Sequence, residues 1–123
     1  MTDAAAVFEA LRALLAPYAG SLAVQTDMAT ELYLDTRHAQ KNGKPLFFGA
    51  VQVKKGFVSY HLMPVYVQPA LLDRVSPALK ARMQGKSCFN FKAVDPALFA
   101  ELAALTRAGY DSYVEQGFVP ARS

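Results

Sequence analysis

The chain has 123 residues and a formal net charge of +3, with 53% hydrophobic and 19% charged residues. This length fits one domain, and the composition is that of a globular protein rather than a disordered chain. The single cysteine, Cys88, excludes a disulfide-framed secreted domain. The N-terminal sequence does not resemble a signal peptide, and no apolar run reaches the roughly 20 residues that span a bilayer. We therefore expect one cytoplasmic domain over residues 1–123.

The basic residues are concentrated in the middle of the chain. Between Thr36 and Val94 there are ten lysines and arginines and one acid, Asp73. Such a segment can attract an anionic partner, although lysines also keep loops and strand edges soluble. Both interpretations stay open from the sequence.

The predicted elements run in the order helix, four strands, short helices, strand, long helix. The first helix is capped by Thr2 or Asp3 and ends before Pro17. Two later helices begin with a cap followed by proline, at Ser76 and Asp95, and end at Gly85 and Gly117. The strands are predicted at residues 22–26, 32–36, 47–53, 57–63 and 88–92, and a short helical turn at 69–72.

Short links between consecutive strands require antiparallel pairing. The fold class predicted from this order is α+β. It consists of a single-layer antiparallel sheet of about five strands, with the N- and C-terminal helices packed on one face.

The most informative turn is Lys55-Gly56, which reads as the two-residue loop of a hairpin. In that register Lys54 pairs with Phe57, and Ala50 pairs with His61. Side-chain alternation then separates a helix-covered face from an opposite face. The residues expected on the covered face are Val51, Val53, Val58, Tyr60, Leu62, Phe89 and Phe91.

The opposite face collects polar and aromatic side chains from four strands. A few polar groups on an apolar background are typical of a small-ligand site, whereas an ordinary solvated sheet face is the alternative. Phe48 and Tyr33 are expected to form the walls of this site, and Asp35 to lie beside them. The candidate ligand-binding residues are Tyr33, Gln52, Ser59, His61, Cys88, Asn90 and Lys92.

Other chemistry is less well supported. His61 and Cys88 could form a metal pair or a nucleophile and its base, but metal sites need three or four ligands and the other histidine, His38, falls in a loop. We predict no catalytic residue, metal or cofactor. Aromatic residues among lysines can stack on bases, but no nucleic-acid-binding motif accompanies them, so a nucleic-acid partner is disfavoured, as is a membrane.

Three segments carry a resemblance to a known family: Phe48–Val53, Tyr60–Pro64 and Lys86–Lys92, together with the helix begun by Ser76 and Pro77. The chain resembles the DUF1801, or YdhG-like, family of small bacterial proteins over residues 20–116. The resemblance implies a compact domain with an antiparallel sheet and assigns no chemistry to it. Some relatives are described as frataxin-like intracellular iron carriers.

Three functions follow as hypotheses. The first is a binding or adaptor module for a small or anionic ligand on the open sheet face, with His61 as a hydrogen-bonding group and Lys92 as the charge. The second is a protein-interaction or homodimerisation module that uses Met63, Val65 and Tyr66. The third is an iron carrier, which is disfavoured because iron needs clustered carboxylates and the middle of the chain is basic.

Overall fold

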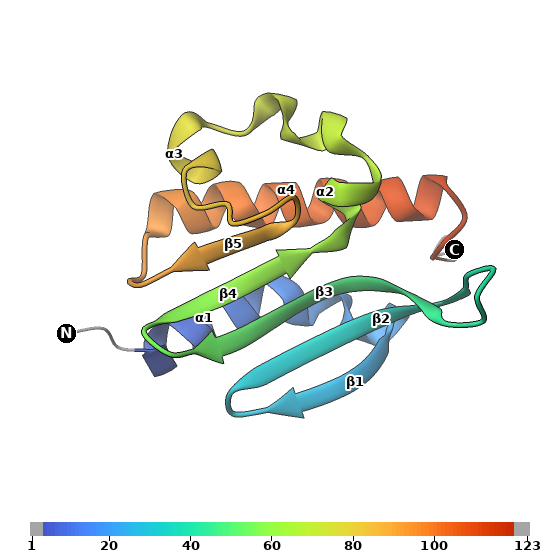
Figure 1. The fold of residues 1–123 in the computed structure, drawn as a ribbon, viewed down its shortest axis with the longest axis horizontal. Helices are drawn as coiled ribbons and strands as arrows, with labels where there is room; N and C mark the ends of the chain where they lie inside the picture. Colours follow the sequence, from blue (N-terminus) through green and yellow to red (C-terminus); the bar gives the residue numbers. More distant parts are fainter. Residues whose placement is uncertain (1–3, 120–123) are drawn as a thin grey trace.

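The structure is a computed structural model that describes residues 4–119, so the cap expected at Thr2 or Asp3 lies outside the described residues. Five strands form one open antiparallel sheet in the order β1 to β5 (Figure 1). The strands are β1 Ala23–Met28, β2 Glu31–Ala39, β3 Pro45–Lys54, β4 Phe57–Leu62 and β5 Cys88–Phe91. The helical elements are α1 Ala4–Leu15, η1 Ala16–Ser21, α2 Met63–Val67, η2 Pro69–Arg74, α3 Pro77–Lys80 and α4 Pro96–Glu115.

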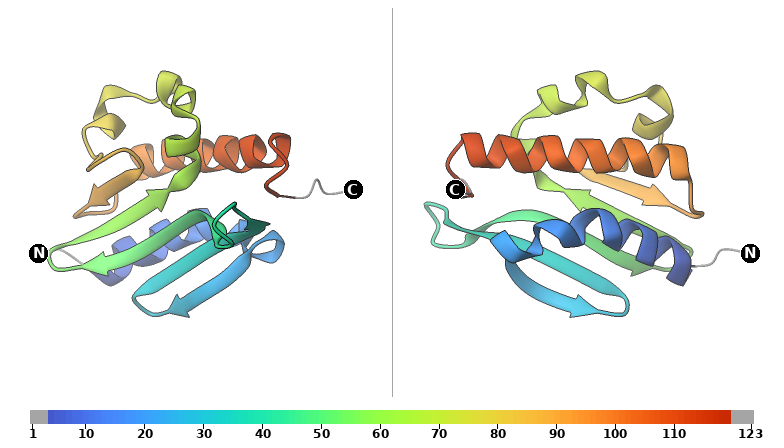
Figure 2. Two further views of the ribbon diagram at one scale, coloured as in Figure 1. Left: turned by 45° about the vertical axis from the view of Figure 1, so that its right-hand side comes forward. Right: turned by 180° about the vertical axis from the view of Figure 1, so that it is seen from behind.

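The two long helices, α1 and α4, lie on the same side of the sheet, as the right-hand view of Figure 2 shows. The face of the sheet turned away from them, here called the outer face, is toward the viewer in Figure 1. The predicted α+β class is confirmed. No helix among residues 4–119 is long and apolar enough to cross a membrane.

The hairpin between β3 and β4 has the predicted register. Lys54 pairs with Phe57 and Ala50 pairs with His61. Gly56 has a φ of 86°, a left-handed conformation that glycine adopts without a steric cost. The side chains of Val51, Val58, Tyr60 and Leu62 are therefore buried on the helix-covered face.

A β-bulge interrupts the alternation earlier in β3. Leu34 pairs with Gly49 and the next residue of β2, Asp35, pairs with Phe47, which leaves Phe48 as an extra residue in β3. An extra residue reverses the direction of every side chain that precedes it in the strand.

The bulge turns Phe48 into the core. Its ring meets those of Tyr110 and Tyr113 edge-on, with centroid distances of 5.9 and 5.8 Å. The prediction that Phe48 forms a wall of the outer face is wrong. Phe47 takes that position and stacks on Tyr33, with the two ring centroids 4.7 Å apart.

The helix predicted from Ser76 to Gly85 is shorter than expected, since α3 ends at Lys80. The backbone beyond it lies along the free edge of β5. There the amide of Gln84 donates to the Cys88 carbonyl at 2.9 Å, and the amide of Asn90 donates to the Arg82 carbonyl at 2.8 Å. Pairing with β5, which follows a few residues later, thus replaces the last turns of the helix and covers one edge of the sheet.

Apolar contacts in the core join both helices to the sheet, and hydrogen bonds of two tyrosine hydroxyls add to the contact between the sheet and α4. Tyr60 is fully buried, and its hydroxyl lies 2.6 Å from the Thr106 hydroxyl on α4. The hydroxyl of Tyr113 donates to the Phe47 carbonyl at 2.9 Å. The second bond ties α4 to the strand just before the bulge, so helix and bulge hold each other in place.

Gly49 lies where no side chain fits, which gives a test of this packing. A Cβ on Gly49 would lie 2.9 Å from the His61 carbonyl oxygen and 3.1 Å from a methyl group of Leu15. We expect Gly49→Ala to lower the free energy of unfolding by about 1–3 kcal/mol because β3 must move away from both β4 and α1. Urea unfolding measures this. Gly20→Ala is the matched control, because a Cβ there meets no atom within 4 Å; equal effects of the two substitutions would contradict the packing.

Candidate functional site

The outer face is organised in two rows that cross the sheet. Residues directly opposite each other on neighbouring strands share a face. The first row runs Thr26, Tyr33, Ala50, His61 and Cys88, from β1 to β5. The second row runs Met28, Glu31, Gln52, Ser59 and Asn90. The register therefore places six of the seven candidate residues together, and the seventh, Lys92, follows immediately after β5.

His61 is the centre of a polar cluster at the β4–β5 end of these rows. Its Nε2 atom lies 3.3 Å from the Ser59 hydroxyl and 3.9 Å from the Cys88 sulfur. The Cys88 thiol in turn donates to Oδ1 of Asn90 at 3.5 Å. The four side chains come from only two strands, so their geometry depends on the pairing of β4 with β5 alone.

Burial keeps the two reactive groups of this cluster neutral. Burial lowers the pKa of His61, and the nearby positive charge of Lys54 lowers it further. Burial raises the pKa of the Cys88 thiol, although Lys54 partly opposes that shift. A neutral thiol is a weak nucleophile, so the cluster is suited to hydrogen bonding rather than to thiol chemistry.

The opposite end of the outer face is aromatic and acidic. Tyr33 and Phe47 form a stacked, half-buried pair, and Asp35 lies beside them on β2. Burial raises the pKa of Asp35. The Glu31 carboxylate accepts from the Gln52 amide at 2.8 Å. Gln52 is thus held by its neighbour, which leaves it less free to bind a ligand than the sequence suggested.

The β5 end of the face opens into a hollow of about 290 Å³. Its lining residues are Phe57, Ala81, Arg82, Met83, Gln84, Asn90 and Lys92. Two of the predicted site residues, Asn90 and Lys92, therefore reach a concave surface. Ala50 and Ser59, in the middle of the sheet, are buried beneath their neighbours, so that part of the face is a packed polar layer.

Arg82 and Lys54 extend the site beyond the predicted residues. Arg82 lines the hollow with Lys92, and neither of the two forms an ion pair with any residue between 4 and 119. Lys54 could have been found from the sequence, because the hairpin register already places it opposite Phe57 on the outer face. Arg82 could not, since nothing in the sequence indicates that its segment pairs with β5.

The apolar patch predicted for an interaction surface is only partly exposed. Val65 is buried, whereas Tyr66 is 55% exposed. The structure therefore corrects the grouping of Met63, Val65 and Tyr66. Val24 and Met28, on β1, are exposed by 48% and 61%.

No three His, Cys, Asp or Glu side chains within the described part of the chain are grouped so that they could hold a metal ion. Comparisons of the chain with protein-family models, with curated proteins and with solved structures gave no match. The resemblance to the DUF1801 family therefore stays a prediction, and the function has to be argued from the geometry of the site.

The neutral state of His61 predicts a pH dependence of stability. Its folded-state pKa lies below the ordinary value of 6.5, so the unfolded chain takes up a proton first as the pH falls. The stability that the neutral imidazole contributes is present above about pH 6.5 and is lost as the pH falls from there toward the folded pKa. We expect the unfolding free energy of the wild type, relative to that of His61→Gln, to decrease between pH 7.5 and 5 in urea titrations. A difference that does not change with pH would contradict a buried neutral imidazole.

Proposed function

We propose that the protein is a non-catalytic binding module for a small anion, which sits in the hollow at the β5 end of the outer face. The observation that carries this proposal is the pair of cationic side chains, Arg82 and Lys92, that line one hollow and form no ion pair with an acid among residues 4–119. Cations that face a shared cavity hold an anion more tightly than isolated lysines in water.

The remaining lining groups supply directional hydrogen bonds. The side-chain amides of Asn90 and Gln84 can donate to the oxygens of a phosphate or carboxylate. Phe57 gives an apolar wall to the same hollow. This combination of a few polar groups and an aromatic wall is typical of small-ligand sites.

The His61 cluster supports this site through Asn90. Because the Cys88 thiol donates to Oδ1 of Asn90, that amide is oriented with its NH2 group free to donate. Nε2 of His61 contacts the Cys88 sulfur, and the Ser59 hydroxyl contacts the same Nε2 atom. Of the seven candidate residues, Asn90 and Lys92 would contact the anion, and Ser59, His61 and Cys88 would position Asn90. Tyr33 and Gln52 do not line the hollow.

Titration with inorganic phosphate at low ionic strength, followed by amide chemical shifts, tests the proposal. We expect saturable shifts at residues 82–84 and 90–92. Lys92→Met and Arg82→Met should each raise the dissociation constant about two- to fivefold, the range for an exposed charge pair.

Lys44→Met is the matched control, because it removes the same charge from the exposed β2–β3 loop at the far end of the sheet (Figure 1). It should leave the dissociation constant unchanged. If all three substitutions raised the dissociation constant equally, phosphate would be attracted by net charge alone. If the amide shifts occurred elsewhere on the chain, phosphate would not bind in this hollow. Either result would refute the proposal.

A second candidate function is homodimerisation through β1. This strand forms the edge of the sheet that no residue among 4–119 covers, whereas residues 82–84 cover the edge at β5. Its exposed Val24 and Met28 would be buried if two copies of β1 paired. A free strand edge with exposed apolar side chains favours pairing with another chain.

Sedimentation velocity over a range of concentrations tests this second candidate. We expect the wild type to form dimers and Val24→Lys to remain monomeric, because an edge lysine blocks strand pairing. Val94→Lys, a change at an exposed valine distant from β1, should leave dimers intact. A wild-type chain that sediments as a monomer at every concentration would eliminate this function.

A further inference from the structure

The last row of the outer face places an aromatic ring between two cations. Lys54 on β3 pairs with Phe57 on β4. Because Val58 pairs with Phe91, continuing that register by one residue brings Lys92 to the other side of Phe57, and both residues line the same hollow. Neighbouring strands are about 4.8 Å apart, so the two lysines start roughly 10 Å from each other with the Phe57 ring between them.

The anion site proposed at Arg82 and Lys92 lies between two hollows. Both side chains line the hollow of about 290 Å³ that also contains Phe57. The same two side chains line a smaller hollow of about 140 Å³, which is completed by Phe91, Ala93, Val94 and Asp95. An anion held by these cations therefore has space on both of its sides, as a phosphate that is esterified to two groups requires.

The charge around Phe57 is not neutralised by acidic side chains. Lys54, Arg82 and Lys92 form no ion pair with any residue between 4 and 119, and none of the described residues that line the larger hollow is acidic. Asp95 lines only the smaller hollow, where its carboxylate caps α4 by accepting from the Leu98 amide at 3.1 Å. Phosphates are therefore favoured beside Phe57, whereas the smaller hollow favours an uncharged group such as a sugar.

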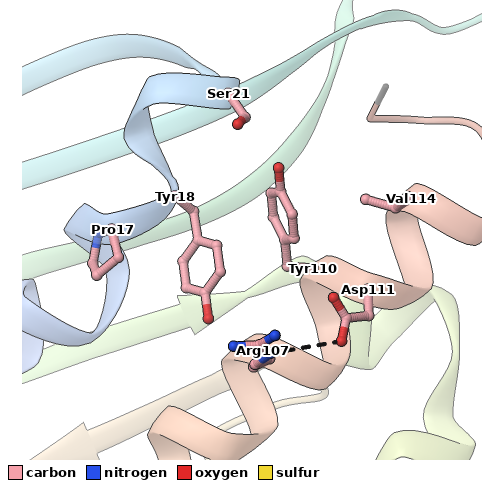
Figure 3. Close-up of a pocket in the computed structure, with 7 residues that line it drawn as sticks. All are labelled: Pro17, Tyr18, Ser21, Arg107, Tyr110, Asp111 and Val114. Atoms are coloured by element: carbon pink, nitrogen blue, oxygen red, sulfur yellow. Dashed lines mark ion pairs between the residues drawn. The ribbon is translucent and has the colours of Figure 1, made fainter. Parts of the chain in front are cut away.

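A cavity of about 390 Å³ between η1 and α4 also combines a cation with aromatic rings (Figure 3). There Nε of Arg107 lies 3.9 Å from the Asp111 carboxylate, which repels a phosphate. The rings of Tyr18 and Tyr110 pack against each other, with 4.8 Å between their centroids. This cavity is thus less suited to a polyanion than the row at Phe57, and Arg107 serves as a control in the experiment below.

We propose that this surface binds single-stranded nucleic acid. The inference rests on the anion site proposed above and identifies its anion as an internal phosphate of the strand. One base stacks on the Phe57 ring, and its two flanking phosphates pair with Lys54 on one side and with Arg82 and Lys92 on the other. The sugar of the next nucleotide enters the smaller hollow.

The strand is single because the bases of a duplex are already stacked on one another and do not present a free face to a side chain. Cations that follow the backbone and an aromatic ring that stacks on a base are the features that single-strand-binding surfaces share. The sequence does not show this surface, because Arg82 reaches it only through the turn that folds residues 82–84 back onto β5.

Fluorescence anisotropy with end-labelled tetrathymidylate tests the inference, with inorganic tripolyphosphate as a competitor that carries phosphates but no bases. At an ionic strength of about 0.15 M we expect tetrathymidylate to bind saturably and tripolyphosphate to bind more weakly. Phe57→Leu should raise the dissociation constant of tetrathymidylate about five- to tenfold, the lower part of the range for stacking of one base. It should change that of tripolyphosphate less than about twofold, because leucine keeps the apolar wall without offering a ring.

The salt dependence of binding tests the two flanking phosphates separately. Lys54→Met should lower the slope of log Kd against log salt concentration by about 0.7, the value for one phosphate of a single strand. Because Lys54 is exposed, this variant keeps the inference testable if Phe57→Leu does not fold.

Two matched controls accompany these variants. Phe47→Leu makes the same substitution at another half-buried phenylalanine of the outer face, roughly 20 Å further along β3 from Lys54. Arg107→Met removes one positive charge at the cavity between η1 and α4. Both should leave the affinity for tetrathymidylate unchanged.

The inference is overturned if tripolyphosphate binds as tightly as tetrathymidylate, if Phe57→Leu weakens both probes equally, or if either control weakens tetrathymidylate as much as its counterpart at the site. Each of these results leaves the anion site standing when inorganic phosphate still shifts the amides of residues 82–84 and 90–92. Loss of those phosphate shifts would instead refute the anion site itself, and the inference with it.

Discussion

The pairing register of the β3–β4 hairpin is the constraint on which the outer face depends. A two-residue turn at Lys55 and Gly56 puts Lys54 opposite Phe57, and every later pair in the hairpin follows from that one. Because side chains alternate along a strand, a slip of one residue would bury His61 against the helices and expose Tyr60. Tyr60 is fully buried and bonded to Thr106, so the core and the turn specify the same register.

The bulge at Phe48 shows how packing overrides strict alternation. With regular pairing, Phe48 would lie on the outer face and Phe47 in the core. The extra residue instead puts Phe48 among the tyrosines of α4 and leaves the Phe47 carbonyl in reach of the Tyr113 hydroxyl. The same bulge gives the outer face its stacked aromatic pair with Tyr33. One irregularity in β3 thus shapes both sides of the sheet.

The polar groups on the two sides of the sheet differ in the way they are satisfied. On the outer face the thiol, imidazole and hydroxyl groups bond to one another, which keeps them neutral and turns an amide toward the hollow at Lys92. Under α4 the Tyr110 hydroxyl has no such neighbour among the described residues. A self-satisfied cluster orients other groups.

The sequence by itself determined the fold class, the β3–β4 register and the placement of His61, Cys88 and Asn90 on one face, because turn chemistry and period-two alternation act over a few residues. The same register could also have placed Lys54 on this face, although the prediction did not include it. Only the tertiary structure decided the position of Phe48, the end of α3 and the arrival of Arg82 beside Lys92. The position of Phe48 depends on contacts with α4, far along the chain, and the other two depend on the turn that folds residues 82–84 back onto β5. The hydrophobic pattern of the sequence carries no information about either. The cavity between η1 and α4 belongs to this second class, since it exists only because η1 packs beside α4.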